Sequence, residues 1–238
     1  MLKRAFIAVV ALLALAITLS LGAWQWGRGQ QRSAIQEAIA AREHMGPLAA
    51  SQLPPVLERD DPLLHRPVLL RGEWLPQRTV FLDNRQMNGA PGFYVVTPLR
   101  LEGRQDVILV QRGWAPRNFE RREALPPVAT PAGVVEVHGR LAPPPAKLYA
   151  FDKEETGPIR QNLDLAWFRA ETGLPLLPYS VQQTGAASEG LVRQWPQVGS
   201  GAEKNFGYAF QWWALAALIA ILYVWFQLVL PRRQARRA

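Results

Sequence analysis

The stretch FGYAFQWWALAALIAILYVWFQLVL, from Phe206 to Leu230, contains no charged residue and no proline. A helix of about 20 such residues is about 30 Å long and matches the hydrocarbon core of a bilayer. A second apolar stretch of this length, residues 5–24, lies near the N-terminus. Because lipid offers no partner to a polar backbone group, both stretches are predicted to be transmembrane helices, over residues 5–26 and 205–230.

A cleaved signal peptide is the alternative interpretation of the first stretch. Its apolar run is longer than the apolar region of a typical signal peptide, and Trp24-Gln25-Trp26 is an unfavourable processing site. We therefore expect the first helix to be retained.

Basic residues beside the two stretches predict how the chain crosses the membrane. They precede the first stretch and follow the second: Lys3, Arg4, Arg232, Arg233, Arg236 and Arg237. The positive-inside rule then places two short tails, residues 1–4 and 231–238, in the cytoplasm and residues 27–204 on the other side. These charges make up most of the formal net charge of +8, so the basic composition reflects topology and does not favour a nucleic acid partner.

Residues 27–204 are predicted to form a β-rich domain preceded by a helical extension of the first span. The extension is rich in Ala, Gln, Glu and Arg and ends at Met45-Gly46-Pro47. Short apolar stretches separated by turn residues then indicate antiparallel strands, over residues 68–74, 78–84, 93–101, 106–113, 135–141 and 179–183. One helix is expected from Leu163 to Thr172, with Asn162 as its N-cap. The predicted fold class is therefore a membrane protein with two terminal transmembrane α-helices and an intervening α+β, mainly antiparallel β, barrel- or sandwich-like domain.

Three details of the strand pattern carry further expectations. Asn88-Gly89 and Glu102-Gly103 are hairpin turn signals. The segment from Val107 to Val110 is apolar without alternation, which is typical of a central strand covered on both faces. Gly72 and Gly139 occupy the same place in two similar strands, where each is expected to mark a bend or a bulge.

The polar residues do not indicate catalysis. The frames GxSxG and HExxH and a Gly-rich phosphate loop are all missing from the sequence, and no Cys is present. His44, His65 and His138 lack the spacing of a metal site, and His138 is expected to face water. Gln25 and Gln211 lie near the outer boundary of the spans, where their amides could bond across the helix pair or be hydrated. We expect neither an enzyme nor a metal site.

Four segments together resemble the Surfeit locus protein 1 family, the membrane assembly factors for cytochrome c oxidase. Gly22-Ala23-Trp24-Gln25-Trp26-Gly27-Arg28 is similar to the family's G-x-W-Q-x-x-R. Residues 92–99, GFYVVTPL, and 110–116, VQRGWAP, are similar to its G-x-x-V-x-T-P-L and V-N-R-G-W-V-P, and residues 208–212, YAFQW, to its Y-A-x-x-W. The family positions carried over are Gly22, Gln25, Arg85, Gly92, Pro98, Arg112, Gly113 and Trp114.

The resemblance implies a chaperone-like assembly factor of the respiratory chain that helps to mature the haem-copper subunit. In some members it binds haem a, for which Trp24, Tyr208 and Trp212 would supply aromatic faces and Arg28 a cation for the propionates. The family commonly has His three residues before the Tyr, whereas this chain has Asn205, a poor ligand for haem iron. Belt aromatics beside a lipid headgroup would explain the same residues.

The resemblance also implies partners and a location. The partners are the catalytic subunit of cytochrome c oxidase, the lipid bilayer and the enzymes of haem a synthesis. The expected location is the bacterial inner membrane, with the central domain in the periplasm. A scaffold of a respiratory complex that binds no haem is one alternative, and a membrane-tethered periplasmic enzyme is another. A two-span receptor is disfavoured because the predicted tails leave no room for an output module.

Overall fold

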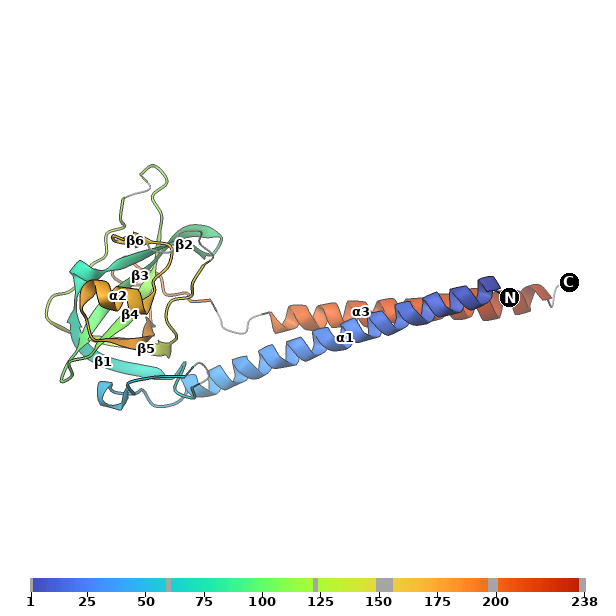
Figure 1. Cartoon of the computed structure of the whole chain (residues 1–238), viewed down its shortest axis with the longest axis horizontal. Helices are drawn as coiled ribbons and strands as arrows, with labels where there is room; N and C mark the ends of the chain where they lie inside the picture. The colour runs from blue at the N-terminus through green and yellow to red at the C-terminus, as the bar shows by residue number, and fades with distance from the viewer. Residues whose placement is uncertain (1, 59–60, 122–123, 149–155, 197–200, 236–238) are drawn as a thin grey trace. The chain divides into compact units, whose positions relative to one another are not determined.

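The computed structural model of this chain describes residues 2–58, 61–121, 124–148, 156–196 and 201–235. The chain divides into two compact units, residues 1–38 with 197–238 and residues 39–196. The first unit consists of two long helices, one from each end of the chain, and the second is a β domain with one short helix (Figure 1). The predicted fold class is confirmed.

Helix α1 is continuous from Leu2 to Glu43 and includes both the predicted span and its helical extension. The second terminal helix begins as α3 (Ala202–Val224). Both are long and apolar enough to cross a bilayer, and most of their apolar side chains are exposed. Soluble proteins rarely expose apolar surfaces of this size, because their contact with water is unfavourable, so the chain is a membrane protein.

The second terminal helix extends past its predicted end at Leu230. After α3 a π-helical turn, Trp225–Val229, leads into α4 (Leu230–Ala235), which contains Pro231. A proline ring normally clashes with the carbonyl four residues earlier. That carbonyl, of Gln227, lies in the wider π turn, where the Leu230 N–H donates to the Trp225 carbonyl five residues earlier. The helix therefore continues through Pro231 to Ala235, five residues beyond the predicted span. Residues 1 and 236–238 of the predicted tails lie outside the described residues.

The described part of the β domain contains a seven-stranded sheet in the order β1-β5-β7-β4-β3-β2-β6. The strands are β1 (Pro67–Trp74), β2 (Val80–Met87), β3 (Ala90–Leu101), β4 (Val107–Pro116), β5 (Val134–Ala142), β6 (Ile159–Arg160) and β7 (Leu176–Gln183). A further pairing of β1 with β3 closes five of these strands into a barrel, while β2 and β6 extend beyond it. The barrel alternative is thus the one observed.

Both predicted hairpin turns are confirmed. Asn88 and Gly89 connect β2 to β3 with φ of 51° and 78°, as a type I′ turn requires, and Gly103 lies in the turn between β3 and β4. Strand β6 was not predicted, because two residues give no periodic signal. It pairs in parallel with Phe81 and Leu82 of β2.

Strand β4 is the middle strand of the seven-stranded sheet and is covered on both faces, as predicted. Ile108 and Val110 belong to the cluster inside the barrel, whereas Val107 and Leu109 pack with Phe168 of helix α2 (Leu165–Thr172). The N-cap of α2 is Asp164 and not the predicted Asn162: its carboxylate accepts from two backbone amides of the first turn. An ionised side chain is also favoured there by the helix dipole.

Gly72 and Gly139 lie where strands approach each other closely. A Cβ on Gly72 would lie 2.2 Å from the Arg100 carbonyl oxygen, and one on Gly139 would lie 2.4 Å from Cγ1 of Val181. The two strands that share this pattern, β1 and β5, are antiparallel neighbours. The pairing register of β1 and β5 does not shift at either glycine, so these positions are close approaches of the strands and not the expected bulges.

The last turn of α1 is attached to the barrel around His65. Arg42 Nη1 donates to the Leu64 carbonyl at 3.2 Å, and Arg140 Nη1 pairs with Glu43 at 3.1 Å. Nδ1 of His65 is buried and has no hydrogen-bond partner within the described residues. Burial first, and then the charges of Arg140 and Arg42, lower the pKa of His65 from its ordinary value of 6.5.

This arrangement predicts that acid weakens the attachment. Since the folded chain holds His65 neutral, the unfolded chain binds more protons below pH 6.5, and the free energy of unfolding should decrease from there down to the folded pKa. The control variant is His65→Asn, since Asn tolerates the left-handed φ of 69° at this position. Denaturation at pH 7.5 and pH 5.5 checks the effect. An equal loss of stability in the wild type and the variant would contradict it.

Candidate functional site

The two terminal helices pack through a seam of small residues. A Cβ on Gly22 would lie 2.2 Å from Nε1 of Trp213, and one on Gly29 would lie 2.6 Å from Cε1 of Phe206. Each glycine is therefore the socket of one aromatic ring. The seven-residue spacing of the sockets is that of a helix pair with knobs-into-holes packing. The buried residues of the two helices are small and include Thr18, Gly22 and Ala216.

A hydrogen-bonded network crosses the seam where the first predicted span ends and the second begins. Asn205 Nδ2 donates to Gln25 Oε1 at 2.6 Å, and Arg32 Nη1 donates to Asn205 Oδ1 at 2.9 Å. Gln25 thus bonds across the helix pair, but its partner is Asn205 and not Gln211, which is exposed. Sequence reasoning did not identify Arg32, which lies seven residues after Gln25 on the same side of the helix.

The proposed haem contacts lie on both terminal helices, Trp24 and Arg28 on α1 and Tyr208 and Trp212 on α3. Trp26 of α1 packs on Phe206 of α3, with ring centroids 4.7 Å apart. Trp24 precedes Trp26 by two residues and Tyr208 follows Phe206 by two, and two residues turn a helix by about 200°. Trp24 and Tyr208 therefore each lie on the side of their own helix that faces away from the contact between Trp26 and Phe206.

Arg28 follows Trp24 by one helical turn, and Trp212 follows Tyr208 by one turn, so each lies on the same face of its helix as the residue that it follows. The Arg28 guanidinium lies 6.0 Å from the centre of the Trp24 ring. Trp24 is 59% exposed and Tyr208 is 54% exposed, so these side chains form an open surface.

This surface does not fit haem as an enclosed site. A cofactor pocket usually buries most of its ligand, whereas these aromatic faces are open. The amide of Asn205, at the position of the family's His, is bonded on both sides to Gln25 and Arg32. Among the four proposed contacts, the Tyr208 hydroxyl is the one group of a type that ligates haem iron. Across the described residues there is no group of three or more His, Cys, Asp or Glu side chains that could hold a metal ion.

In the β domain, three of the family positions build a corner between β2, β3 and β4. Trp114 Nε1 donates to the Arg85 carbonyl at 2.9 Å. A Cβ on Gly92 would lie 2.3 Å from the Ala115 carbonyl oxygen and 2.6 Å from the Trp114 ring. The Arg85 guanidinium lies over the ring of Tyr94 and donates to the Gln161 carbonyl at 2.8 Å.

Arg112 holds two loops against β4 from inside the domain. Its side chain is fully buried, pairs with Glu189 at 3.0 Å and donates to Thr130 at 2.7 Å. The guanidinium also lies 4.7 Å from the centre of the Trp74 ring. Glu189 pairs with Arg193 as well, at 3.1 Å, so one carboxylate serves two arginines.

Gly113 and Pro98 have backbone roles. A Cβ on Gly113 would lie 2.8 Å from the Cβ of Leu191, in a segment whose Val192 forms a β-bridge with Trp114. Pro98 lies in β3 between the residues paired with β2 and those paired with β1. A missing N–H costs least at such a change of partner.

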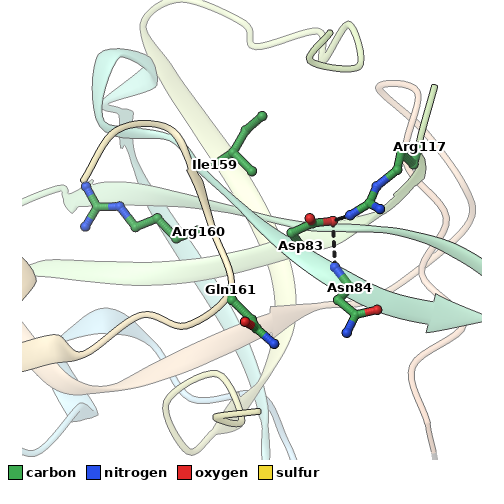
Figure 2. Close-up of a pocket in the computed structure, with 6 residues that line it drawn as sticks. All are labelled: Asp83, Asn84, Arg117, Ile159, Arg160 and Gln161. Carbon is green, nitrogen blue, oxygen red and sulfur yellow. Dashed lines mark hydrogen bonds and ion pairs between the residues drawn. The ribbon is translucent and has the colours of Figure 1, made fainter. Parts of the chain in front are cut away.

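Beside this corner lies a polar pocket of about 300 Å³, which Figure 2 shows. It is lined by Asp83, Asn84, Arg117, Ile159, Arg160 and Gln161. The Asp83 carboxylate pairs with Arg117 and accepts the backbone N–H of Asn84 (Figure 2). The pairing register of β2 shifts between Leu82 and Arg85, which turns Asp83 and Asn84 towards the pocket. Sequence reasoning did not identify this pocket.

The sequence model of the SURF1 family matches residues 12–217, which include most of α1, the first part of α3 and the whole barrel. The chain belongs to the SURF1 family. Three relatives agree with this membership. A "SURF1-like protein" of Drosophila melanogaster is 25% identical over 237 residues, which covers 91% of this chain and 75% of the relative.

The other two SURF1 relatives match shorter parts. "Surfeit locus protein 1" of Arabidopsis thaliana is 33% identical over 116 residues, 45% of this chain and 33% of the relative. A "SURF1-like protein" of Rickettsia felis is 31% identical over 109 residues, 44% of this chain and 45% of the relative. The match thus spans a third of the plant protein and less than half of the Rickettsia protein.

Proposed function

We propose that this chain is an assembly factor for cytochrome c oxidase that acts by protein contact from the bacterial inner membrane. The observation that carries the proposal is the family match over residues 12–217, which includes parts of both terminal helices as well as the barrel. The motif positions shared with the family lie at packing points in both units: Gly22 receives Trp213, and Gly92 receives Trp114. We propose that these positions keep the helices and the barrel in the shape that the partner contacts.

The proposal includes an orientation. Lys3 and Arg4 precede α1, and four arginines follow the apolar part of the second helix. With both tails in the cytoplasm, the barrel lies in the periplasm, where the outer parts of an oxidase subunit are accessible. The partners are then the catalytic subunit of the oxidase and, through it, the enzymes that make haem a.

Co-purification tests the contact. The full chain carrying an affinity tag is isolated in mild detergent from membranes in which the oxidase is being induced, with a subunit of another respiratory complex as the control protein. We expect the oxidase catalytic subunit, and not the control subunit, to accompany the chain. Recovery of both in equal proportion, or of neither, would contradict the proposal.

The role of haem a is the finer part of the proposal. We propose that Asn205 serves the helix seam and ligates no iron, since both ends of its amide are bonded within the helix pair. An absorbance titration of the detergent-purified chain with haem a is expected to leave the haem spectrum unchanged. Stoichiometric binding that Trp212→Ala weakens would contradict this and assign haem to the surface of Trp24, Arg28, Tyr208 and Trp212.

A further inference from the structure

The pocket beside β2 contains an excess of positive charge. Two arginines line it, Arg117 and Arg160, and the guanidinium of Arg85 donates to the carbonyl of the lining residue Gln161. Two carboxylates face them: Asp83 pairs with Arg117, and Glu171 binds Arg160 through both of its oxygens at 2.7 and 2.8 Å. Arg85, which is 5% exposed, has no carboxylate partner among the described residues. The site as a whole lacks one negative charge.

Two of these arginines also have unused hydrogen-bond donors. Nε of Arg117 and Nε of Arg85 are buried without a hydrogen-bond partner in the described part of the chain. A buried N–H that has given up its water without gaining an acceptor is costly, and few native groups remain so. Both the charge and the unused donors call for the same complement, an anion with acceptor oxygens.

The surrounding structure holds Arg117 in place for such an anion. Its guanidinium lies over the ring of the fully buried Phe93, with 5.6 Å to the ring centre, and its backbone N–H donates to the Pro91 carbonyl at 3.3 Å. In Figure 2 Arg117 and Arg160 lie on opposite sides of Asp83, with the Asn84 amide nearby. Arg160 binds Glu171 through both Nη atoms and donates its Nε–H to the Gly157 carbonyl, whereas Nε of Arg117 has no acceptor among the described residues, so Arg117 is the cation that we expect to take a ligand.

We propose that this pocket binds a carboxylate group of a partner protein, with Arg117 as its main contact. Its volume of about 300 Å³ admits one side chain or one chain terminus and no larger cofactor. The family positions Arg85, Gly92 and Trp114 then have a shared role, since they pack the corner between β2, β3 and β4. Asp83 lies on β2 at this corner, and Arg117 directly follows β4. This inference rests on the proposed function only for the identity of the partner.

Isothermal titration of the full chain in detergent with three blocked peptides tests the site. Acetyl-Ala-Ala-Asp-amide presents a side-chain carboxylate, acetyl-Ala-Ala-Ala with a free C-terminus presents a terminal one, and acetyl-Ala-Ala-Ala-amide presents none. We expect one or both of the first two to bind and the third not to bind, and the stronger of the two identifies the source of the carboxylate. Equal binding of all three peptides, or of none, would overturn the proposal.

Two substitutions should change this binding in opposite directions. Arg117→Gln should weaken it at least about tenfold, the usual effect of losing a charge-assisted hydrogen bond. Asp83→Asn should strengthen it, because it removes the carboxylate that competes for Arg117. The matched control is Arg71→Gln, whose arginine forms an exposed pair with Glu102 outside the pocket. An affinity for the acidic peptides that Asp83→Asn leaves unchanged or weakens would overturn the assignment, even if Arg117→Gln fails to fold.

The outcomes for the pocket and for the function are separable. Binding of the acidic peptides by a chain that never co-purifies with the oxidase would support the pocket and refute the proposed partner. Co-purification that persists when the pocket binds no carboxylate would leave the proposed function intact and remove the pocket from it.

Discussion

Glu189→Gln is expected to lower the free energy of unfolding of the barrel by about 3–5 kcal/mol. The reason is that Arg112 is fully buried and pairs with this carboxylate, and removal of one partner leaves the other charge unpaired in a medium of low polarity. Chemical denaturation of the purified chain, followed by tryptophan fluorescence, measures the loss.

A surface pair provides the control for this experiment. Glu102 pairs with Arg71 at 3.3 Å, and both side chains are about half exposed. Glu102→Gln should therefore change the free energy of unfolding by less than about 0.5 kcal/mol. Similar effects of the two substitutions would contradict the claim that the ion pair between Arg112 and Glu189 is buried and stabilises the barrel.

Gly22→Leu is expected to separate the two terminal helices. The Trp213 ring lies where the new side chain would begin, and overpacking of this kind costs about 1–3 kcal/mol, enough to reduce helix pairing about tenfold or more. The chain contains no native cysteine, so a disulfide between Gln25→Cys and Asn205→Cys reports pairing directly. We expect the yield of this disulfide to fall at least about tenfold.

Gly27→Leu is the matched substitution, because a Cβ on Gly27 would meet nothing within 4 Å. It adds the same apolar volume to the same helix, five residues away. Disulfide yields that fall equally in both variants would show that the loss comes from glycine itself and not from the Trp213 socket.

Much of the fold follows from local sequence signals. The spans are predicted from apolar length, the hairpin from Asn88-Gly89, and the doubly covered β4 from its unbroken apolar run. The chemistry that each signal reports is contained in a few consecutive residues. No such local signal predicts the π turn at Trp225–Val229, after which the helix continues through Pro231 to Ala235.

The candidate sites depend on contacts between distant residues, which the sequence alone does not provide. Gln25 and Asn205 are 180 positions apart, and no local pattern predicts that their amides meet. The polar pocket combines β2, β6 and the end of β4, and β6 is too short to be detected. The resemblance to the family identified Arg85 and Arg112 as positions, but only the structure shows which groups they contact.

The amount of assembled oxidase in membranes tests the central claim most directly. In a bacterium whose own homologous gene is deleted, the absorbance of haem a in the oxidase is measured with and without this chain, relative to the b-type cytochromes of the other complexes. The account predicts that the haem a band is strongly reduced without the chain and restored by the wild type and by Gly27→Leu, but not by Gly22→Leu. A haem a band that is normal in the deletion strain would contradict it.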